Sequence, residues 1–254
     1  MCGIVGIYLK TKKFEKNLGK MLSGMLNNME SRGPDSAGFA IYKNEKKDIF
    51  KYSLCLNDLN FKNFKKEISN KIKKIQLSQH ADHVILKTPI EPKIVIKIIN
   101  KNFPEVSIVG YGHSIEIFKQ VGNPKDVVKK FKLDSFSGTH GIGHTRMATE
   151  SAITTDGSHP YSTGIDECLV HNGSLSNHNN LRRELVKKGN IFNSENDTEV
   201  AAGYVSNSLS NKKSLKDTLT SGLKDLDGFY TFITGTRKGF AVVRDEIACK
   251  PAVI

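Results

Sequence analysis

The sequence predicts an α+β protein in which stacked β-sheets are flanked by helices. Strand-like segments lie near both ends of the chain, at residues 1–9 and 229–244, and segments with a helical spacing of apolar residues lie between them. Apolar residues make up 38% and charged residues 25% of the chain, which is typical of a globular rather than a disordered protein. The 254 residues can bury a core without disulfides or a structural metal.

The first forty residues predict a strand, a helix and a second strand. Residues 1–9 alternate small and apolar side chains, which favours a buried strand that begins almost at the terminus. Residues 14–31 place leucine and methionine side chains at helical spacing, so a helix follows. Residues 31–36 contain the glycine, proline and aspartate typical of a turn, and a strand at 38–42 comes next.

Residues 51–137 predict a small basic α+β insertion within a domain that spans residues 2–254. We expect helices at 61–76, 91–102 and 124–131 and strands at 84–87, 106–111 and 115–118. His80 and His83 form a lone His-x-x-His pair with Asp82 between them. Because the local sequence offers no third ligand, we expect no metal site in this chain.

The residues after 137 predict the rest of the stacked sheets. Residues 138–146 contain several glycines and lead into a predicted strand. We expect further strands at 165–170, 229–234 and 239–244 and helices at 177–188, 199–209 and 214–226. Side chains that commonly cap helices, at 194–199, support the start of the second of these helices.

The net charge of +12 is confined to the first part of the chain. Residues 138–254 carry 13 basic and 13 acidic side chains, whereas residues 1–137 carry 25 basic and 13 acidic ones. The chain has 32 lysines and only 6 arginines, although arginine is the residue that favours base and phosphate recognition. We therefore expect no nucleic acid as a partner and interpret the basic insertion as a docking face for an acidic protein surface.

Neither the cysteines nor the apolar segments indicate an extracellular or membrane protein. The four cysteines, Cys2, Cys55, Cys168 and Cys249, are widely spaced and form no Cys-x-x-Cys motif. No apolar run approaches the roughly 18–20 residues that a membrane span needs. The N-terminal segment lacks the basic region and cleavage site of a signal peptide, so we expect a cytoplasmic protein without a membrane partner.

Cys2 differs from the other cysteines in its position. Removal of a methionine that precedes a small residue would leave Cys2 as the first residue, with its thiol beside its own α-amine. An α-amine has a pKa of about 8, which suits a proton acceptor near neutral pH. Such an N-terminal nucleophile carries its own base, and the strand that follows would hold it rigidly. The alternative is that Cys2 is only a small buried apolar residue.

Three further polar clusters fit one substrate. Arg146 can pair with a carboxylate through two guanidinium nitrogens. Asp197 can hold an ammonium group, and Asn172 with Gly173 can offer a side-chain amide and a backbone N–H to an oxyanion. A carboxylate, an ammonium and a polarised amide carbonyl together describe glutamine or asparagine.

Five ordered motifs resemble those of class II glutamine amidotransferases. They are Cys2-Gly3-Ile4-Val5-Gly6, Arg32-Gly33-Pro34-Asp35-Ser36, Gly143-His144-Thr145-Arg146, His171-Asn172-Gly173 and Asn196-Asp197-Thr198-Glu199. Members of this family are N-terminal-nucleophile hydrolases with a four-layer αββα sandwich. The resemblance implies the same α+β sandwich for this chain, with the basic insertion added to it.

The resemblance also implies a role for each matched residue. Cys2 would attack the amide of glutamine and form a glutamyl thioester, with release of ammonia. Asn172 and Gly173 would form the oxyanion hole. Arg146 would bind the carboxylate of the substrate, and Asp197 would bind its amine.

Two more residues are expected around the substrate. Thr149 lies in Arg146-Met147-Ala148-Thr149-Glu150, where many family members have Arg-Trp-Ala-Thr-His, so the tryptophan and the histidine are absent here. Arg32 is expected to support the Cys2 loop, with a purely structural role as the alternative.

The insertion and the segments Thr149–Ala152 and Leu226–Tyr230 resemble the separate amidotransferase-like subunit of N-methylglutamate synthase, an enzyme related to glutamate synthase. This resemblance implies a hetero-oligomer in which the chain supplies ammonia to glutamate synthase-like subunits. The chain has no glycine-rich dinucleotide or phosphate loop, so we expect no cofactor in it and place flavin and iron–sulfur groups on a partner subunit. A non-catalytic regulatory or scaffolding subunit that retains the glutamine pocket is the alternative.

Overall fold

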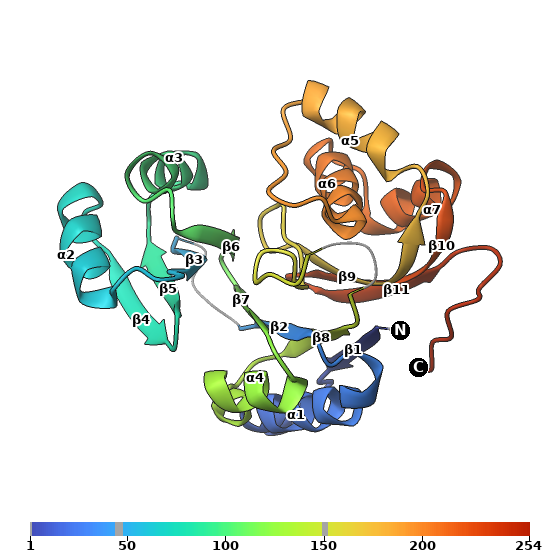
Figure 1. Cartoon of the computed structure of the whole chain (residues 1–254), viewed down its shortest axis with the longest axis horizontal. Coiled ribbons are helices and arrows are strands. Elements are labelled where there is room, and N and C mark those ends of the chain that lie inside the picture. Colours follow the sequence, from blue (N-terminus) through green and yellow to red (C-terminus); the bar gives the residue numbers. More distant parts are fainter. Residues whose placement is uncertain (1, 44–47, 149–151) are drawn as a thin grey trace.

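A computed structural model describes residues 2–43, 48–148 and 152–254 of the chain, and two antiparallel sheets lie face to face in its body (Figure 1). The first sheet has the strand order β1-β8-β2-β7. Its strands are β1 (Gly3–Tyr8), β2 (Ser36–Tyr42), β7 (Ile115–Val121) and β8 (His140–Arg146). The second sheet has the order β11-β10-β9. Its strands are β9 (Cys168–Leu175), β10 (Gly228–Thr236) and β11 (Gly239–Arg244).

An apolar core fills the space between the two sheets. Because side chains alternate along a strand, each strand directs every second residue into this space. Ala40 and Ile142 of the first sheet meet Val170 and Ile233 of the second there, all at most 5% exposed. The stacking of two sheets on one core brings the ends of their strands close together, which is where the polar motifs lie.

Helices cover the outer face of each sheet. On the first sheet lie α1 (Leu18–Asn28) and α4 (Pro124–Phe131), and short 3₁₀ turns at Lys12–Asn17, Glu30–Arg32 and Leu133–Ser135 accompany them. On the second sheet lie α5 (His178–Lys187), α6 (Asp197–Ser210) and α7 (Leu215–Asp225). The layers are therefore helix, sheet, sheet and helix, which confirms the predicted αββα sandwich. No helix in the described ranges is long and apolar enough to cross a membrane.

The insertion stands to one side of the sandwich with a sheet and core of its own (Figure 1). Its antiparallel strands follow the order β4-β5-β3-β6. They are β3 (Phe50–Cys55), β4 (Gln76–His80), β5 (His83–Thr88) and β6 (Ser107–Gly112), and its helices are α2 (Phe61–Lys71) and α3 (Pro92–Asn102). Phe64 of α2, Val95 of α3 and Leu86 of β5 are fully buried in this separate core.

The predicted insertion at 51–137 and the observed one differ at the C-terminal boundary. Strand β7 pairs with β2 of the body residue by residue, from Ser36 opposite Val121 to Tyr42 opposite Ile115. Helix α4 packs beside α1 on the same sheet. The separate unit therefore ends at Gly112, and residues 115–137 belong to the sandwich. The apolar pattern of a strand does not show which sheet the strand joins, and that of a helix does not show which sheet it covers. For this reason the prediction from sequence assigns β7 and α4 to the insertion.

Candidate functional site

Cys2 lies immediately before β1, which is an edge strand of the first sheet. The chain passes close to its neighbours here, because a Cβ atom at Gly3 would lie 2.7 Å from Thr145 Oγ1 and 2.8 Å from Met29 Cβ. Glycine at this position therefore lets the start of β1 fit between β8 and the end of α1. The thiol of Cys2 is partly exposed, and its Sγ lies 3.8 Å from the carbonyl oxygen of Met147.

A cavity of about 360 Å³ opens beside Cys2. Arg146 reaches it from the end of β8, Asn172 and Gly173 from β9, and Asp197 from the first turn of α6. Five of the seven predicted site residues thus line one space, although up to 195 positions separate them along the chain. Arg32 does not line this cavity, and Thr149 lies outside the described residues.

The loop before β2 braces the segment that carries Arg146. The backbone N–H of Asp35 donates to the carbonyl of Arg146, and the Asp35 carboxylate accepts from the N–H of Ala148 at 2.8 Å. The Arg146 side chain is buried, and its Nη1 donates to the carbonyl of Ala152 at 3.1 Å. The motif from Arg32 to Ser36 therefore fixes the backbone around Arg146 at the edge of the cavity.

Gly173 presents its backbone N–H at the open edge of the second sheet. Tyr230 of β10 lies opposite Gly173. The Tyr230 N–H donates to the Asp245 carboxylate and the Tyr230 carbonyl accepts from the Asp245 N–H, so both backbone groups of Tyr230 point away from β9. Gly173 is therefore in a non-hydrogen-bonded pair, and since β9 is an edge strand, its N–H points out of the sheet. Its φ is +150°, and the Cβ of any other residue would lie 2.0 Å from the Phe229 carbonyl oxygen, so this position requires glycine.

The side chain of Asn172 adjoins this N–H. Asn172 is 6% exposed and lines the cavity next to Gly173. Its side-chain amide makes no hydrogen bond to the part of the protein that the structure describes, so its N–H groups are available to a molecule in the cavity. An amide N–H and a backbone N–H side by side can stabilise an oxyanion.

Asp197 is held as a carboxylate. Its Oδ2 accepts from the Leu175 N–H at 2.8 Å, and its Oδ1 accepts from the Thr198 hydroxyl at 3.2 Å and lies 3.6 Å from His171 Nδ1. Burial alone would raise the pKa of Asp197, but His171, the Leu175 N–H and Thr198 together lower it to about 2. A fixed negative charge in this position can bind an ammonium group.

A network of buried histidines supports Asp197 from behind. Since the Thr198 hydroxyl donates to Asp197, its oxygen accepts from His159 Nε2 at 2.8 Å and from His171 Nδ1 at 3.0 Å. His144 stacks on His159 with ring centroids 3.9 Å apart, and its Nε2 donates to the His171 carbonyl. Burial lowers the pKa of His144 to about 3 and that of His159 well below its usual value, so both rings are neutral.

The sequence did not reveal this network. His144, His171 and Thr198 lie within recognised motifs, but the motifs do not show that these side chains meet. His159 lies in the loop between β8 and β9 with no periodic pattern around it. Lys250 also lines the cavity, with its Nζ 4.9 Å from the centroid of the Phe229 ring, and nothing in the sequence pointed to it.

A second cavity, of about 530 Å³, adjoins the first. Cys2 and Asn172 line both of them. Most of the remaining lining of the second cavity is apolar, from β1, α1, β10, β11 and residues 251–254, and Arg32 lies in its wall. The thiol of Cys2 therefore lies between a polar space and an apolar one.

The geometry of the polar cavity matches the features of an α-amino acid with a side-chain amide. A guanidinium and a carboxylate can bind the two charged groups of such a substrate, and the thiol and the oxyanion donors lie beside each other. Among the residues that line this cavity, histidine and acidic side chains do not gather into a metal cluster within the described parts of the chain.

Comparisons with known proteins agree with this geometry. Residues 144–254 match a family described as "Glutamine amidotransferase domain". The glutamine amidotransferase-like protein GlxB of Rhizobium meliloti is 49% identical over 260 residues, which cover all of this chain and 85% of that protein. A glutamine–fructose-6-phosphate aminotransferase of Methanococcus maripaludis is 30% identical over 56% of this chain and 25% of that protein.

A solved structure supports the same grouping at the level of the fold. The allosteric regulatory enzyme of purine biosynthesis superposes with a TM-score of 0.57 at 20% identity, over 93% of this chain and 36% of that chain. Together with the full-length similarity to GlxB, this shows that the chain belongs to the class II glutamine amidotransferase family, built on the N-terminal-nucleophile hydrolase fold.

Proposed function

We propose that the chain hydrolyses glutamine through Cys2 and supplies the ammonia to a glutamate synthase-like partner. The observation that carries the first half of this proposal is the convergence of Cys2, Arg146, Asn172, Gly173 and Asp197 on one cavity. Membership of a family of glutamine amidotransferases supports glutamine as the substrate.

The first step requires Cys2 as the N-terminal residue. Removal of Met1 frees the α-amine of Cys2, which accepts the thiol proton as Sγ attacks the amide carbon of glutamine. Arg146 binds the α-carboxylate of the substrate and Asp197 its α-ammonium, so the side-chain amide extends toward the thiol. Binding at both charged groups fixes the orientation of the substrate before the bond forms.

The tetrahedral intermediate carries its negative charge on the former carbonyl oxygen. Asn172 and Gly173 donate hydrogen bonds to this oxygen, and the ammonium of Cys2 returns its proton to the leaving nitrogen. Ammonia departs and leaves a glutamyl thioester on Sγ. A water molecule then attacks the thioester, glutamate leaves, and the thiol regains its proton.

The apolar cavity provides a space for ammonia on the other side of the nucleophile. Ammonia that entered bulk water near neutral pH would become protonated and lose its nucleophilic lone pair. An apolar lining disfavours the charged form and therefore keeps ammonia neutral. The position of Cys2 and Asn172 in the walls of both cavities supports transfer from one to the other.

The proposal of a glutamate synthase-like partner rests on the resemblance of the sequence to the amidotransferase-like subunit of N-methylglutamate synthase. One of the segments that carry it, Leu226–Tyr230, lies at the start of β10, and its Phe229 lines the polar cavity. In this proposal the partner carries the flavin and iron–sulfur groups, and its product is N-methylglutamate or glutamate. The complex is then a hetero-oligomer in which this chain contributes only ammonia.

The decisive experiment measures glutamate released from glutamine by the purified chain, alone and together with purified subunits of the proposed synthase-like partner. We expect Cys2→Ala to reduce the rate by at least about 10³-fold, because the nucleophile is lost. Cys249→Ala, which removes an exposed cysteine, is the matched control and should retain activity. Equal activity of the native chain and Cys2→Ala would overturn the mechanism.

A second candidate function is a regulatory or scaffolding subunit that binds glutamine without hydrolysing it. The observation in its favour is Met147, which lies 39% exposed in the wall of the cavity where many relatives have tryptophan. An unprocessed Met1 in the mass spectrum of the mature chain, together with glutamine binding and no glutamate release in the assembled complex, would support this candidate.

A further inference from the structure

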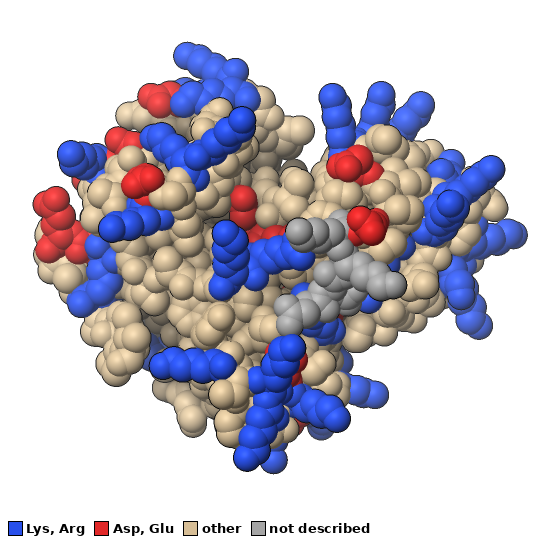
Figure 2. Space-filling view, turned by 180° about the vertical axis from the view of Figure 1, so that it is seen from behind, with Lys and Arg blue, Asp and Glu red and all other residues tan. Residues whose placement is uncertain are grey.

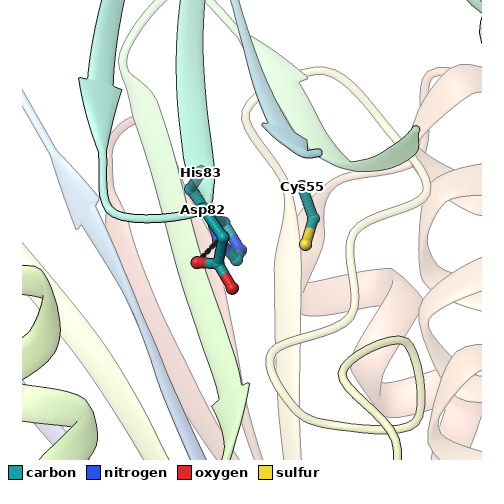
Figure 3. Close-up of side chains that lie close together, drawn as sticks. All are labelled: Cys55, Asp82 and His83. Carbon is teal, nitrogen blue, oxygen red and sulfur yellow. Dashed lines mark hydrogen bonds and ion pairs between the residues drawn. The ribbon is translucent and has the colours of Figure 1, made fainter. Parts of the chain in front are cut away.

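Asp82 and Asp197 each have a histidine beside their carboxylate, but only Asp197 lines the cavity beside Cys2. In the insertion, Asp82 accepts from His83 Nδ1 at 3.0 Å (Figure 3). Its other oxygen accepts from the ammonium of Lys130 at 2.9 Å. Both oxygens of Asp82 are therefore bound by donors of the protein, one of them a full positive charge, so this aspartate joins parts of the fold.

The carboxylate of Asp197 has a different set of donors. Its Oδ2 accepts from the backbone N–H of Leu175 at 2.8 Å, and its Oδ1 accepts from the hydroxyl of Thr198 at 3.2 Å. Neither donor carries a formal charge, so the negative charge of Asp197 stays available to a cation in the cavity. Each carboxylate oxygen has two lone pairs, and each therefore keeps one for such a ligand.

The hydroxyl of Thr198 has one proton and three polar neighbours. Its oxygen lies 3.2 Å from Asp197 Oδ1, 2.8 Å from His159 Nε2 and 3.0 Å from His171 Nδ1. A carboxylate only accepts, so the proton points to Asp197 and both ring nitrogens donate to the oxygen. The other ring nitrogens, His159 Nδ1 and His171 Nε2, are buried without a hydrogen-bond partner in the described ranges. A buried N–H without an acceptor is costly, so each ring is neutral and carries its proton toward Thr198.

These bonds fix the hydroxyl of Thr198 in one orientation. Two N–H groups occupy the lone pairs of its oxygen, and the residue is 1% exposed, so water cannot replace either donor. Rotation of the hydroxyl would break its bond to Asp197 without offering another acceptor. The carboxylate of Asp197 is consequently oriented before a ligand arrives, which reduces the entropy that binding costs.

His159 is itself held in place by the first sheet. The buried ammonium of Lys119, on β7, donates to the carbonyl of Ser158 at 2.9 Å and to that of Asp156 at 3.0 Å. The ring of His144, on β8, stacks on the ring of His159. Strands of the first sheet therefore determine the position of His159 Nε2, and the hydroxyl that it binds lies at the start of α6, on the second sheet.

We propose that Thr198 and His159 are positioning residues for Asp197, and that they make the site selective for substrates with an α-ammonium group. This inference rests on the proposed role of Asp197 in glutamine binding. Loss of the hydroxyl would leave Asp197 Oδ1 without its donor and free the carboxylate to turn from the cavity. The start of α6 does not need this hydroxyl, because the side chain of Asn196 caps the helix by accepting from the Thr198 N–H at 2.9 Å.

The test compares hydrolysis of L-glutamine with that of glutaramate, which has the same carboxylate and terminal amide but no α-amine. Thr198→Val keeps the shape of the side chain and removes the hydroxyl. We expect it to raise the KM for glutamine about 10-fold, as for loss of one hydrogen bond to a charged group, with kcat within about 2-fold of the native value. For glutaramate both constants should stay within about 2-fold, because no ammonium meets Asp197.

Three further variants separate positioning from a general effect on the fold. Thr198→Ser restores the hydroxyl and should return the KM for glutamine to within about 2-fold of the native value. His159→Leu removes the donor behind Thr198 and should raise the KM for glutamine alone. Added to Thr198→Val, it should change KM by less than about 2-fold more, because both variants break one link. Thr218→Val is the matched control and should affect neither substrate, since this buried threonine of α7 has a hydroxyl without a partner in the described parts of the chain.

Calorimetric titration of the Cys2→Ala chain measures the binding of both ligands without hydrolysis. Thermal unfolding identifies variants that fail to fold. Thr198→Ala, which leaves room for water beside the two ring N–H groups, replaces Thr198→Val if the latter is unfolded, and it should still weaken glutamine binding alone by at least about 3-fold.

The outcomes separate this inference from the proposed function. Glutamine binding that depends selectively on Thr198, without hydrolysis by the native chain, would contradict the proposed function and support the positioning role. A folded Thr198→Val chain that weakens both ligands equally, or that binds glutamine as tightly as the native chain, overturns the positioning role and leaves the Cys2 mechanism intact.

Discussion

The second half of the sandwich and the insertion differ in both charge and chemistry. Residues 138–254 are neutral overall and contribute four of the five predicted site residues that line the cavity beside Cys2. The insertion is rich in lysine, and these side chains project from its outer surface (Figure 2). The excess positive charge of the chain therefore lies away from the candidate catalytic groups. It is a property of the outer surface and gives no information about the substrate.

After loss of the nucleophile itself, the largest effect should come from Asn172→Ala. Removal of the side-chain oxyanion donor should lower kcat for glutamine hydrolysis by about 10²–10³-fold, with a much smaller change in KM, because the bond strengthens only in the transition state. Steady-state glutaminase kinetics measure this split. Asn179→Ala, at an exposed position of α5, should behave like the native chain, and a loss confined to KM would contradict the assignment.

Asp197→Asn should act on binding rather than on chemistry. If Asp197 binds the substrate ammonium as proposed, loss of its charge should raise the KM for glutamine roughly 10–100-fold, as expected for a charge-assisted hydrogen bond of about 1.5–3 kcal/mol. The same kinetics with Asp126→Asn, an exposed aspartate on α4, supply the control. An unchanged KM would remove Asp197 from the binding site.

The contacts of Asp197 also predict how stability depends on pH. Its folded-state pKa of about 2 lies below the unfolded value of about 3.9, so the ionised group stabilises the fold above pH 4. The native chain should exceed Asp197→Asn by about 1–3 kcal/mol in free energy of unfolding at pH 6. This difference should shrink as the pH falls from 4 toward 2, and urea unfolding across that range measures it. A difference that stays constant would mean that the charge of Asp197 contributes nothing.

The sequence predicted the elements of the sandwich well because local patterns determine them. The predicted strand at 38–42 and helix at 177–188 agree with β2 and α5 to within two residues. Sequence patterns predict structure less well where it depends on pairing between segments that are far apart in the chain. Two such cases are the pairing of β7 with β2 in the first sheet and the pairing of Cys55 of β3 with His83 of β5.

In the candidate site, too, residues within local motifs were predictable from the sequence and contacts between distant segments were not. Cys2, Arg146 and Asp197 could be found from motifs because each combines a reactive group with distinctive neighbours in sequence. His159 could not, since its contact with Thr198 joins a loop without periodicity to the start of a helix 39 residues later. The motifs thus identify groups that line the candidate site, while the residues that position those groups emerge only from the fold.

The smallest effect on hydrolysis should come from the lysine-rich surface. Its test reverses four exposed lysines of the insertion to glutamate, namely Lys65, Lys66, Lys73 and Lys74. The glutaminase rate should not change, because these residues lie on or just after α2 and do not line the cavity. Affinity for the synthase-like partner should fall by about 10-fold at low salt and by less at high salt, since exposed charges are screened.

The matched control makes the same four charge reversals on the body, at Lys187, Lys188, Lys212 and Lys213. Both variants change the net charge equally, so only the location of the charge differs between them. Binding measured by titration of one purified subunit into the other should weaken for the insertion variant alone. Equal weakening by both would mean that the partner responds to total charge, and the insertion would then lose its role as a docking face.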